Sequence, residues 1–332
     1  MKRIAINGFG RIGRYALRNL IDRNKYEISA INDLTDPPTL SHLLKYDSVH
    51  GKFPGKVEAG TDCLIINGKK IPVFSYTEIR ELPWAKLKID LVLECTGRFT
   101  DRKSLEAHLT SGAGKVILSA PANEPDVKTV VIGVNDHLLE PADRIVSNAS
   151  CTTNCAAPLI QVLDQKWGVK NAYITTVHSY TGDQRLHDAP HKDLRRARAA
   201  ALSIIPTSTG AAKAITRIFP HLEGMVGGCG MRVPVPNGSI TDITCVLKNN
   251  ATEAGINEEF KRASEEGQVS GILEFCPDPI VSIDIVGNPN SCVFDPEFTS
   301  VVGDMVKILG WYDNESGYSN RLVDLAEKML EF

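Results

Sequence analysis

The first 150 residues alternate short runs rich in β-branched residues with amphipathic stretches, and this alternation restricts the fold more than any other feature. Strands are expected at 2–7, 27–32, 89–94, 115–119 and 129–134, and a helix at 11–22. Strands separated by helical segments predict a parallel sheet that is covered on both faces. The first half of the chain is therefore expected to be an α/β domain.

The pattern changes near residue 149, which predicts a domain boundary there. Helices are expected at 150–166, 256–265 and 317–330, and strands at 172–178, 239–247, 280–285 and 305–312. Strands that follow one another with few intervening helices favour an antiparallel arrangement. The second half is therefore expected to be an α+β domain with a large, mostly antiparallel sheet.

Length, composition and charge exclude several classes of protein. The chain has 332 residues, a length that suits two domains, and a net charge of −3, which gives no global attraction to nucleic acid or anionic membranes. No apolar run is long enough to span a membrane, and the N-terminus carries no secretory pattern. Eight scattered cysteines without a CxxC pair predict reduced thiols, no metal site and a cytoplasmic location.

A glycine-rich motif follows the first expected strand and opens the first expected helix. Residues 8–13 read Gly-Phe-Gly-Arg-Ile-Gly, which fits the G-x-G-x-x-G pattern of dinucleotide-binding, Rossmann-type domains. Gly8 would make the tight turn, Gly10 would admit the pyrophosphate, and Gly13 would let helix and strand pack closely. The N–H groups near Arg11 and Ile12 would point at the anion.

An acidic residue stands at the expected distance beyond this motif. Asp33 ends the second expected strand, where a carboxylate can accept both ribose hydroxyls and would repel a 2′-phosphate. The alternative is an ordinary turn residue after a strand. With the glycines before it, Asp33 predicts NAD rather than NADP.

A cysteine at the start of an expected helix is the candidate nucleophile. Small polar residues at 147–150 precede Cys151, so its sulfur would lie near a helix N-terminus, where the dipole and unpaired N–H groups favour a thiolate. The same N–H groups could stabilise an oxyanion on a carbonyl that the sulfur attacks. Cys155 lies one turn further on and is expected to be a packed thiol.

Seven segments together closely resemble the phosphorylating glyceraldehyde-3-phosphate dehydrogenase family. They occur in register along essentially the whole chain, at 6–14, 147–155, 178–181, 188–196, 208–213, 231–234 and 311–315. The resemblance implies that 1–149, completed by a C-terminal helix at 317–332, bind NAD and that 150–316 form the catalytic domain.

The resemblance also implies a mechanism. Cys151 would attack the aldehyde of glyceraldehyde 3-phosphate to form a thiohemiacetal, and His178 would pair with the sulfur and take the hydroxyl proton as hydride leaves for NAD. Inorganic phosphate would then cleave the resulting thioester to 1,3-bisphosphoglycerate. The pathway implied is glycolysis or gluconeogenesis.

Further residues match the family's binding positions. The substrate phosphate would be held by Thr181 and Arg232, with Arg196 also contributing to substrate binding. The positions matching the inorganic-phosphate site are Ser150, Thr152, Thr209 and Gly210. Asn314 matches the residue that holds the nicotinamide carboxamide, and Thr96 and Ser119 match cofactor-side positions at strand ends.

The resemblance extends to a basic loop, and the chain departs from the family pattern at three positions. In the family the loop matching 185–198 lies between subunits and borders the neighbouring cofactor, which implies a homotetramer. Thr77 stands where an Arg is frequent near the adenine, Ser316 replaces a Trp, and Ala189 replaces the usual bacterial Leu. These departures predict somewhat weaker NAD binding than in typical relatives.

The sequence leaves three alternatives open. Erythrose-4-phosphate dehydrogenase is a sister enzyme with a similar Cys, His and nucleotide site, but the intact segments 178–181 and 208–210 favour phosphorolysis. A semialdehyde dehydrogenase would also use Cys and nicotinamide, but the full-length match disfavours it. A non-catalytic binding protein on the same fold would not need Cys151, His178 and Arg232 together.

Overall fold

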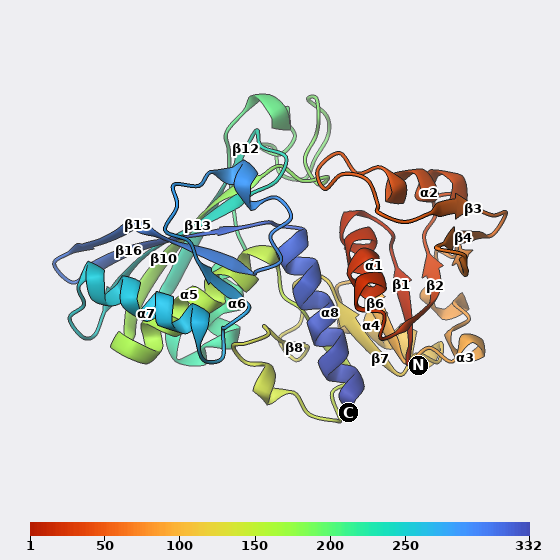
Figure 1. The fold of residues 1–332 in the computed structure, drawn as a ribbon, viewed down its shortest axis with the longest axis horizontal. Coiled ribbons are helices and arrows are strands. Elements are labelled where there is room, and N and C mark those ends of the chain that lie inside the picture. Colours follow the sequence, from red (N-terminus) through yellow and green to blue (C-terminus); the bar gives the residue numbers. More distant parts are fainter. The chain divides into compact units, whose positions relative to one another are not determined.

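The computed structural model describes residues 1–332, which divide into two compact units (Figure 1). The first unit comprises Met1–Val130, Leu138–Ala149 and Ser319–Phe332, and the second comprises Val131–His137 and Ser150–Tyr318. The chain therefore returns to its first unit at its C-terminal end.

None of the helices is long and apolar enough to cross a membrane.

A nine-stranded sheet forms the centre of the first unit. Its order is β3-β4-β5-β2-β1-β6-β7-β9-β8, and every pairing from β5 to β8 is parallel, whereas β3, β4 and β5 form an antiparallel edge. The strands are β1 (Arg3–Asn7), β2 (Glu27–Asn32), β3 (Val57–Ala59), β4 (Cys63–Ile66), β5 (Lys69–Phe74), β6 (Leu91–Glu94), β7 (Lys115–Leu118), β8 (Lys128–Thr129) and β9 (Ile145–Ser147).

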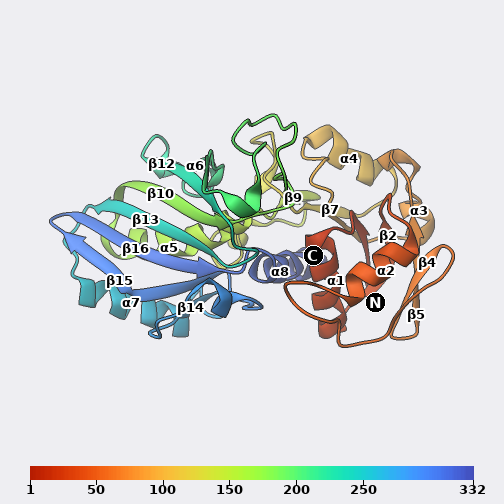
Figure 2. The ribbon, with the colours of Figure 1, turned by 90° about the horizontal axis from the view of Figure 1, so that it is seen from above.

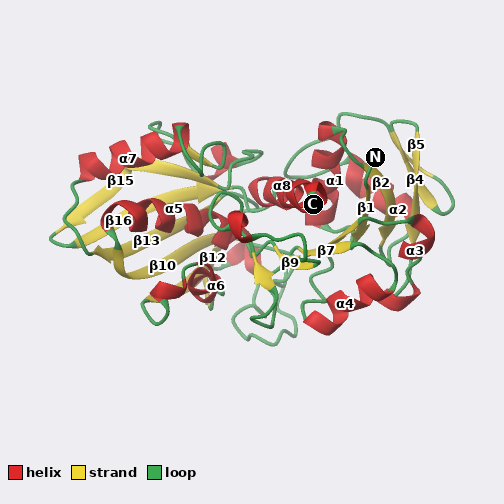
Figure 3. Ribbon diagram, turned by 90° about the horizontal axis from the view of Figure 1, so that it is seen from below, coloured by secondary structure: helices red, strands yellow, loops and turns green.

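Helices cover both faces of this sheet, with α1 and α4 on opposite sides (Figures 2 and 3). The helices are α1 (Arg11–Arg23), α2 (Pro37–Lys45), α3 (Trp84–Leu87) and α4 (Arg102–Thr110). Aspartates cap two of them, because Asp36 and Asp101 each accept a backbone N–H three residues on. The part of α8 (Ser316–Glu331) that belongs to this unit is held to α1 by an ion pair of 2.6 Å between Arg23 and Asp324.

A seven-stranded sheet forms the centre of the second unit. Its order is β11-β12-β10-β13-β16-β15-β14, and four of its six pairings are antiparallel. The strands are β10 (Val169–Ser179), β11 (Ile205–Thr207), β12 (Val226–Val233), β13 (Ser239–Leu247), β14 (Leu273–Phe275), β15 (Cys292–Val302) and β16 (Met305–Tyr312). Helices α5 (Cys151–Trp167), α6 (Ala211–Ile218) and α7 (Glu253–Glu265) lie along one face of this sheet (Figure 1).

The predicted fold class is confirmed: a mostly parallel, Rossmann-type sheet comes first and a mostly antiparallel sheet second. Two predicted strands are wrong. At 129–134 only β8 is extended, because Gly133 adopts a φ of +80° and the backbone turns. At 280–285 the chain forms a short 3₁₀ helix, Ser282–Ile285, since the Asp284 carboxylate accepts the N–H of Val281 and closes a local turn.

Candidate functional site

The glycine motif forms a tight turn between β1 and α1. Gly8 has a φ of +91°, and a Cβ there would lie 2.6 Å from the backbone nitrogen of Thr96. A Cβ on Gly13 would lie 2.2 Å from the carbonyl oxygen of Gly8, so helix and turn touch through bare backbone. Gly10 faces open space instead. The three glycines therefore have different surroundings: a positive-φ turn at Gly8, a close backbone contact at Gly13 and open space at Gly10.

A pocket of about 310 Å³ opens beside this turn at the carboxyl ends of the parallel strands. Its lining residues are Asn7, Gly8, Gly10, Asn32, Asp33, Leu34, Tyr76, Thr77, Cys95, Thr96, Arg98 and Phe99. The carboxylate of Asp33 accepts the N–H groups of Phe9 (2.7 Å) and Thr35 (2.9 Å). Because a carboxylate has about four lone-pair sites, it can still accept two hydroxyls. The pocket therefore fits the nucleoside half of a dinucleotide.

The predicted cofactor residues do not all line this pocket. Gly8, Gly10, Asp33 and Thr96 do, whereas Arg11, Ile12, Gly13 and Ser119 do not. The guanidinium of Arg11 is paired with Asp47 at 2.9 Å, and the N–H of Ser119 donates to the carbonyl of Glu94. Asn314 belongs to the second unit.

In the second unit, Cys151 is the first residue of α5. Ser150 caps the helix, because its Oγ accepts the N–H of Thr153 at 3.1 Å while its own backbone stays extended. The sulfur therefore lies at the end of the helix where N–H groups are unpaired. Cys155, one turn on, is buried, and its thiol donates to the carbonyl of Gly310 as a packed thiol would.

His178 and Arg232 complete a three-residue centre with Cys151. Cys151 Sγ lies 3.5 Å from His178 Nε2, and His178 Nδ1 lies 2.7 Å from both Arg232 Nη1 and the carbonyl oxygen of Ser179. His178 and Arg232 are paired directly across β10 and β12. A guanidinium only donates, so Nδ1 either accepts from Arg232 or carries a hydrogen toward Ser179. Arg232 also donates to the Ser179 carbonyl at 3.0 Å.

Burial dominates the ionisation of this centre. It raises the pKa of Cys151 to about 11, against the opposing effect of Arg232 and nearby N–H groups. Burial and the positive charge of Arg232 lower the pKa of His178 to about 3. Burial therefore favours the neutral forms of both groups, whereas Arg232 and the N–H groups at the helix start favour the thiolate that the sequence predicts.

Two of the predicted phosphate residues, Thr152 and Arg196, lie near the centre. Thr152 Oγ1 is 2.8 Å from the hydroxyl of Tyr312, whose ring packs edge-on against His178. Burial lowers the pKa of both His178 and Arg232, and the positive charge of Arg196 lowers both further. Three cationic or imidazole groups thus converge here, an arrangement that suits anionic substrates.

The side chains of Arg196 and Thr209 are anchored by local hydrogen bonds. Arg196 donates to Asp183 at 2.7 Å and to Thr207 at 2.9 Å. Thr209 Oγ1 accepts the N–H of Ala211, next to Gly210, where α6 begins and a Cβ would meet nothing within 4 Å. The backbone N–H of Thr181 donates to Gln184, with a separation of 3.4 Å.

Asn314 is oriented by two buried hydroxyls. Its Oδ1 accepts from Ser179 at 2.7 Å and from Ser239 at 3.3 Å. These bonds turn the Nδ2 amide group away from both serines and leave it able to donate to a carboxamide oxygen. Because Ser179 follows His178 directly, Asn314 is tied to the same strand end as the imidazole.

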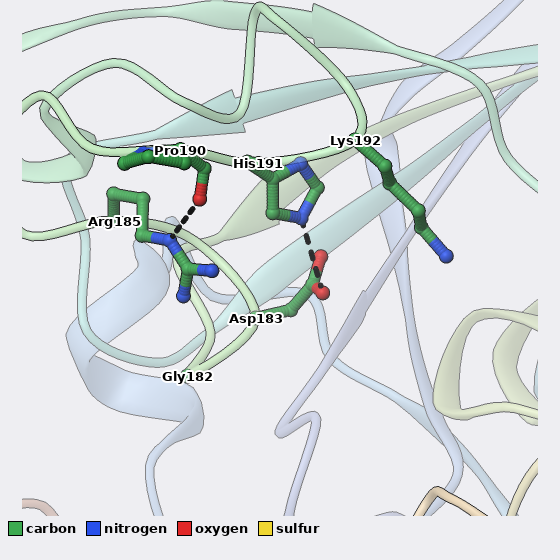
Figure 4. A pocket seen from close by; sticks show the side chains of 6 residues that line it. All are labelled: Gly182, Asp183, Arg185, Pro190, His191 and Lys192. Carbon is green, nitrogen blue, oxygen red and sulfur yellow. Dashed lines mark hydrogen bonds and ion pairs between the residues drawn. The ribbon is translucent and has the colours of Figure 1, made fainter.

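The loop between β10 and β11 forms a pocket of about 590 Å³, shown in Figure 4. Arg185 donates to the carbonyl of Pro190, and His191 lies 3.4 Å from Asp183, while Lys192 extends away from these pairs. The same segment exposes four large apolar side chains, Leu186, Leu194, Leu202 and Ile204. The surface of this loop is therefore neither an ordinary polar surface nor a uniformly basic one, because exposed apolar side chains lie among the charged ones.

Two family models match this chain. Residues 2–102 match "Glyceraldehyde 3-phosphate dehydrogenase, NAD binding domain", and residues 150–314 match "Glyceraldehyde 3-phosphate dehydrogenase, C-terminal domain". The chain is 52% identical over 327 residues to glyceraldehyde-3-phosphate dehydrogenase 2 of Streptomyces avermitilis, covering 98% of this chain and 97% of that one. The chain belongs to the glyceraldehyde-3-phosphate dehydrogenase family.

Two further relatives have similar identity. Glyceraldehyde-3-phosphate dehydrogenase of Borreliella burgdorferi is 51% identical over 336 residues, covering 99% of this chain and 100% of the relative. Glyceraldehyde-3-phosphate dehydrogenase 1 of Bacillus subtilis is 51% identical over 326 residues, covering 98% and 97%. The family membership predicted from the seven segments is confirmed, and the matching family models include an NAD-binding domain.

The three departures from the family pattern occupy different surroundings. Thr77 lines the pocket beside the glycine turn with a short side chain, and Ala189 is exposed in the loop between β10 and β11. Ser316 is buried, where its hydroxyl donates to the carbonyl of Gly287 at 3.2 Å. Ser316 is therefore held by a hydrogen bond at the start of α8.

The sequence interpretation missed several residues that the site uses. Tyr312 was not predicted to be a site residue, yet its hydroxyl is hydrogen-bonded to Thr152 beside Cys151. Asn7 and Asn32 line the pocket beside the glycine turn, although neither was predicted to be a site residue. No group of three or more His, Cys, Asp or Glu residues could hold a metal ion.

Proposed function

We propose that this chain is an NAD-dependent, phosphorylating dehydrogenase that converts D-glyceraldehyde 3-phosphate to 1,3-bisphosphoglycerate in glycolysis or gluconeogenesis. The observation that carries the proposal is the 3.5 Å contact between Cys151 Sγ and His178 Nε2, with Arg232 behind the imidazole. Family membership over nearly the whole chain supports it and favours this reaction over the erythrose 4-phosphate alternative.

The proposed chemistry begins with a neutral thiol. When Nδ1 of His178 donates to the Ser179 carbonyl, Nε2 carries a lone pair that faces the sulfur. As Sγ bonds to the aldehyde carbon, the thiol proton passes to Nε2, which returns it to the new oxyanion. The product of these transfers is a thiohemiacetal on Cys151, with His178 again neutral.

Oxidation and phosphorolysis then follow. NAD, when bound, supplies the acceptor for the hydride. His178 Nε2 takes the hydroxyl proton of the thiohemiacetal in the same step, so that a thioester forms on Cys151. Inorganic phosphate attacks the thioester carbon, the C–S bond breaks, and the imidazolium returns its proton to the leaving sulfur.

We assign the binding groups by their chemistry. Thr181 and Arg232 are proposed for the phosphate of the substrate, with help from Arg196, because hydroxyl and guanidinium groups donate to phosphate oxygens. Ser150, Thr152, Thr209 and Gly210 are proposed for inorganic phosphate. Gly8, Gly10, Arg11, Ile12, Gly13, Asp33, Thr96, Ser119 and Asn314 are proposed for NAD.

The proposed assembly is a cytoplasmic homotetramer. Four exposed apolar side chains between residues 186 and 204 support burial of this loop against another subunit. The two compact units correspond in this proposal to an NAD-binding domain of 1–149 plus the C-terminal helix and a catalytic domain of 150–316.

The test follows NADH formation from glyceraldehyde 3-phosphate and from erythrose 4-phosphate, each with and without inorganic phosphate. Wild type should turn over the triose faster and need phosphate for more than one turnover. Cys151→Ser should show neither burst nor turnover. A wild type as inert as Cys151→Ser would favour a binding protein, and faster turnover of the tetrose would favour the sister enzyme.

A further inference from the structure

A buried glutamate lies behind the cofactor pocket of the first unit. Glu94 is the last residue of β6. Its side chain has no exposed surface and does not line the pocket. Burying a carboxylate costs free energy unless its oxygens are fully hydrogen-bonded. The hydrogen-bond donors to Glu94 therefore indicate the structural role of its carboxylate.

Four donors converge on this carboxylate, two on each oxygen. Oε1 accepts the backbone N–H of Thr96 at 2.8 Å and also its hydroxyl. Oε2 accepts the side-chain amide of Asn7 and lies 3.1 Å from His108 Nε2. Four donors match the lone-pair capacity of an ionised carboxylate, so each oxygen is saturated.

The state of His108 is fixed by Trp84. The indole Nε1 of Trp84, which can only donate, lies 3.0 Å from His108 Nδ1. His108 Nδ1 must therefore accept, and its Nε2 carries the hydrogen that is donated to Glu94. The side chains of Trp84, His108 and Glu94 are all fully buried.

From Glu94 the network continues to the wall of the pocket. The Oδ1 of Asn7 accepts from Asn32 Nδ2 at 2.7 Å. Asn32 in turn accepts the N–H of Tyr76 at 2.9 Å and donates to its carbonyl at 3.1 Å. Asn7, Asn32, Tyr76 and Thr96 all line the pocket, and they follow or end four different strands.

The glycine turn depends on the same bonds. Gly8 donates its N–H to the carbonyl of Asn32 at 2.8 Å, and its α-carbon packs on the backbone of Thr96, with no room for a methyl group. The backbone of Thr96 is held by Glu94 Oε1. A displacement of Thr96 would therefore shift the turn that faces the pyrophosphate in the proposed function.

We propose that Glu94 is a positioning residue for the dinucleotide: its buried carboxylate holds the glycine turn and the ends of four strands in the arrangement that binds NAD. The inference rests on the proposed function, because it concerns the pocket assigned there to NAD. Glu94 does not touch the ligand and takes no part in the chemistry of Cys151.

The test is Glu94→Gln, which keeps size and shape but has one acceptor oxygen and one NH₂ group. Either orientation of the amide places that NH₂ against two donors, on the Thr96 side or on the Asn7 and His108 side. The Kd for NAD, measured by calorimetry well below the melting temperature, should rise about tenfold, which is about 1.4 kcal/mol. The kcat at saturating NAD should stay within about twofold of wild type.

Two further variants separate positioning from general stability. Asp90→Asn makes a similar carboxylate-to-amide change just before the other end of β6, where Asp90 accepts the N–H of Arg3. It should change the melting temperature at most and leave the Kd for NAD unaltered. Asn7→Asp combined with Glu94→Gln lets the introduced amide donate to the introduced carboxylate, which removes the conflict at residue 7 and leaves only the one with His108. This double variant should bind NAD about threefold more tightly than Glu94→Gln alone.

The outcomes distinguish this inference from the proposed function. A wild type that does not bind NAD overturns both. A wild type that binds NAD, with Glu94→Gln equally tight or with the double variant no tighter than Glu94→Gln, overturns the positioning role only. Should Glu94→Gln not fold, Glu94→Asp keeps the charge with one methylene less, and an unchanged Kd in that variant overturns the inference.

Discussion

Replacing Arg232 with Gln is expected to make Cys151 less reactive while leaving the backbone pairing of β10 with β12 in place. Burial raises the pKa of Cys151 to about 11, and Arg232 is the strongest of the groups that oppose this rise. Removing the positive charge therefore raises the pKa further, and the fraction of thiolate at a given pH falls. The pKa of His178, which burial and Arg232 lower to about 3, should rise in the same variant.

The size of the effect follows from the distances in the centre. Arg232 Nη1 is 2.7 Å from His178 Nδ1, and His178 Nε2 is 3.5 Å from Cys151 Sγ. With the imidazole between them, the charge and the sulfur are separated by no more than about 8 Å. At an effective dielectric constant of about 20 the interaction is about 2 kcal/mol, which corresponds to roughly thirtyfold in thiolate.

The assay is alkylation by iodoacetamide without cofactor, with mass spectrometry to follow the peptide that contains Cys151. At pH 8 the Arg232→Gln variant should react about ten to thirty times more slowly than wild type, and the two rates should converge once both thiols are ionised. Arg232→Lys, which keeps the charge, should stay close to wild type. Equal rates for Arg232→Gln and wild type at pH 8 would refute the electrostatic reasoning.

Other positions give independent expectations. Gly8→Ala should lower the free energy of unfolding in urea by at least about 2 kcal/mol, because the added methyl meets the backbone of Thr96. Gly10→Ala, where a methyl has space, should leave that stability within about 0.5 kcal/mol but raise the Kd for NAD. Ser150→Ala should cost about 1 kcal/mol by removing the helix cap. Asp33→Asn should narrow the preference for NAD over NADP in kcat/KM.

Each of these expectations has an opposing result. A stable Gly8→Ala, or a Gly10→Ala that binds NAD like wild type, would contradict the roles given to the glycine turn. An unchanged denaturation midpoint in Ser150→Ala would mean that other groups satisfy the start of α5. An Asp33→Asn enzyme that still rejects NADP would place cofactor selection elsewhere.

Local signals in the sequence were sufficient for part of this site. The glycine spacing and the acid at 33 predict the turn and pocket beside β1, and small polar residues predict the helix that begins at Cys151. These features depend on residues close together in the chain. Local interpretation fails where pairing with a distant segment determines the structure. For example, β12 contains three glycines, which do not favour a strand, yet it pairs with β10.

The electrostatics were less predictable than the fold. A helix start favours a thiolate, but burial of Cys151 outweighs that effect, and burial is a property of the whole fold. Glu94 gives an equally weak signal, because a glutamate at the end of a strand is usually solvated. Only the structure shows that donors from Asn7, Thr96 and His108 surround it.

The direct pairing of His178 with Arg232 places the acid–base group and its cation on adjacent strands. Their separation is therefore fixed by backbone hydrogen bonds along β10 and β12 and does not depend on the movement of any loop. Since successive side chains of a strand alternate between faces, one residue inserted into β12 ahead of Arg232 would slip the register and turn the guanidinium to the opposite side. Such an insertion would disable the enzyme although every residue of its reactive centre remained present.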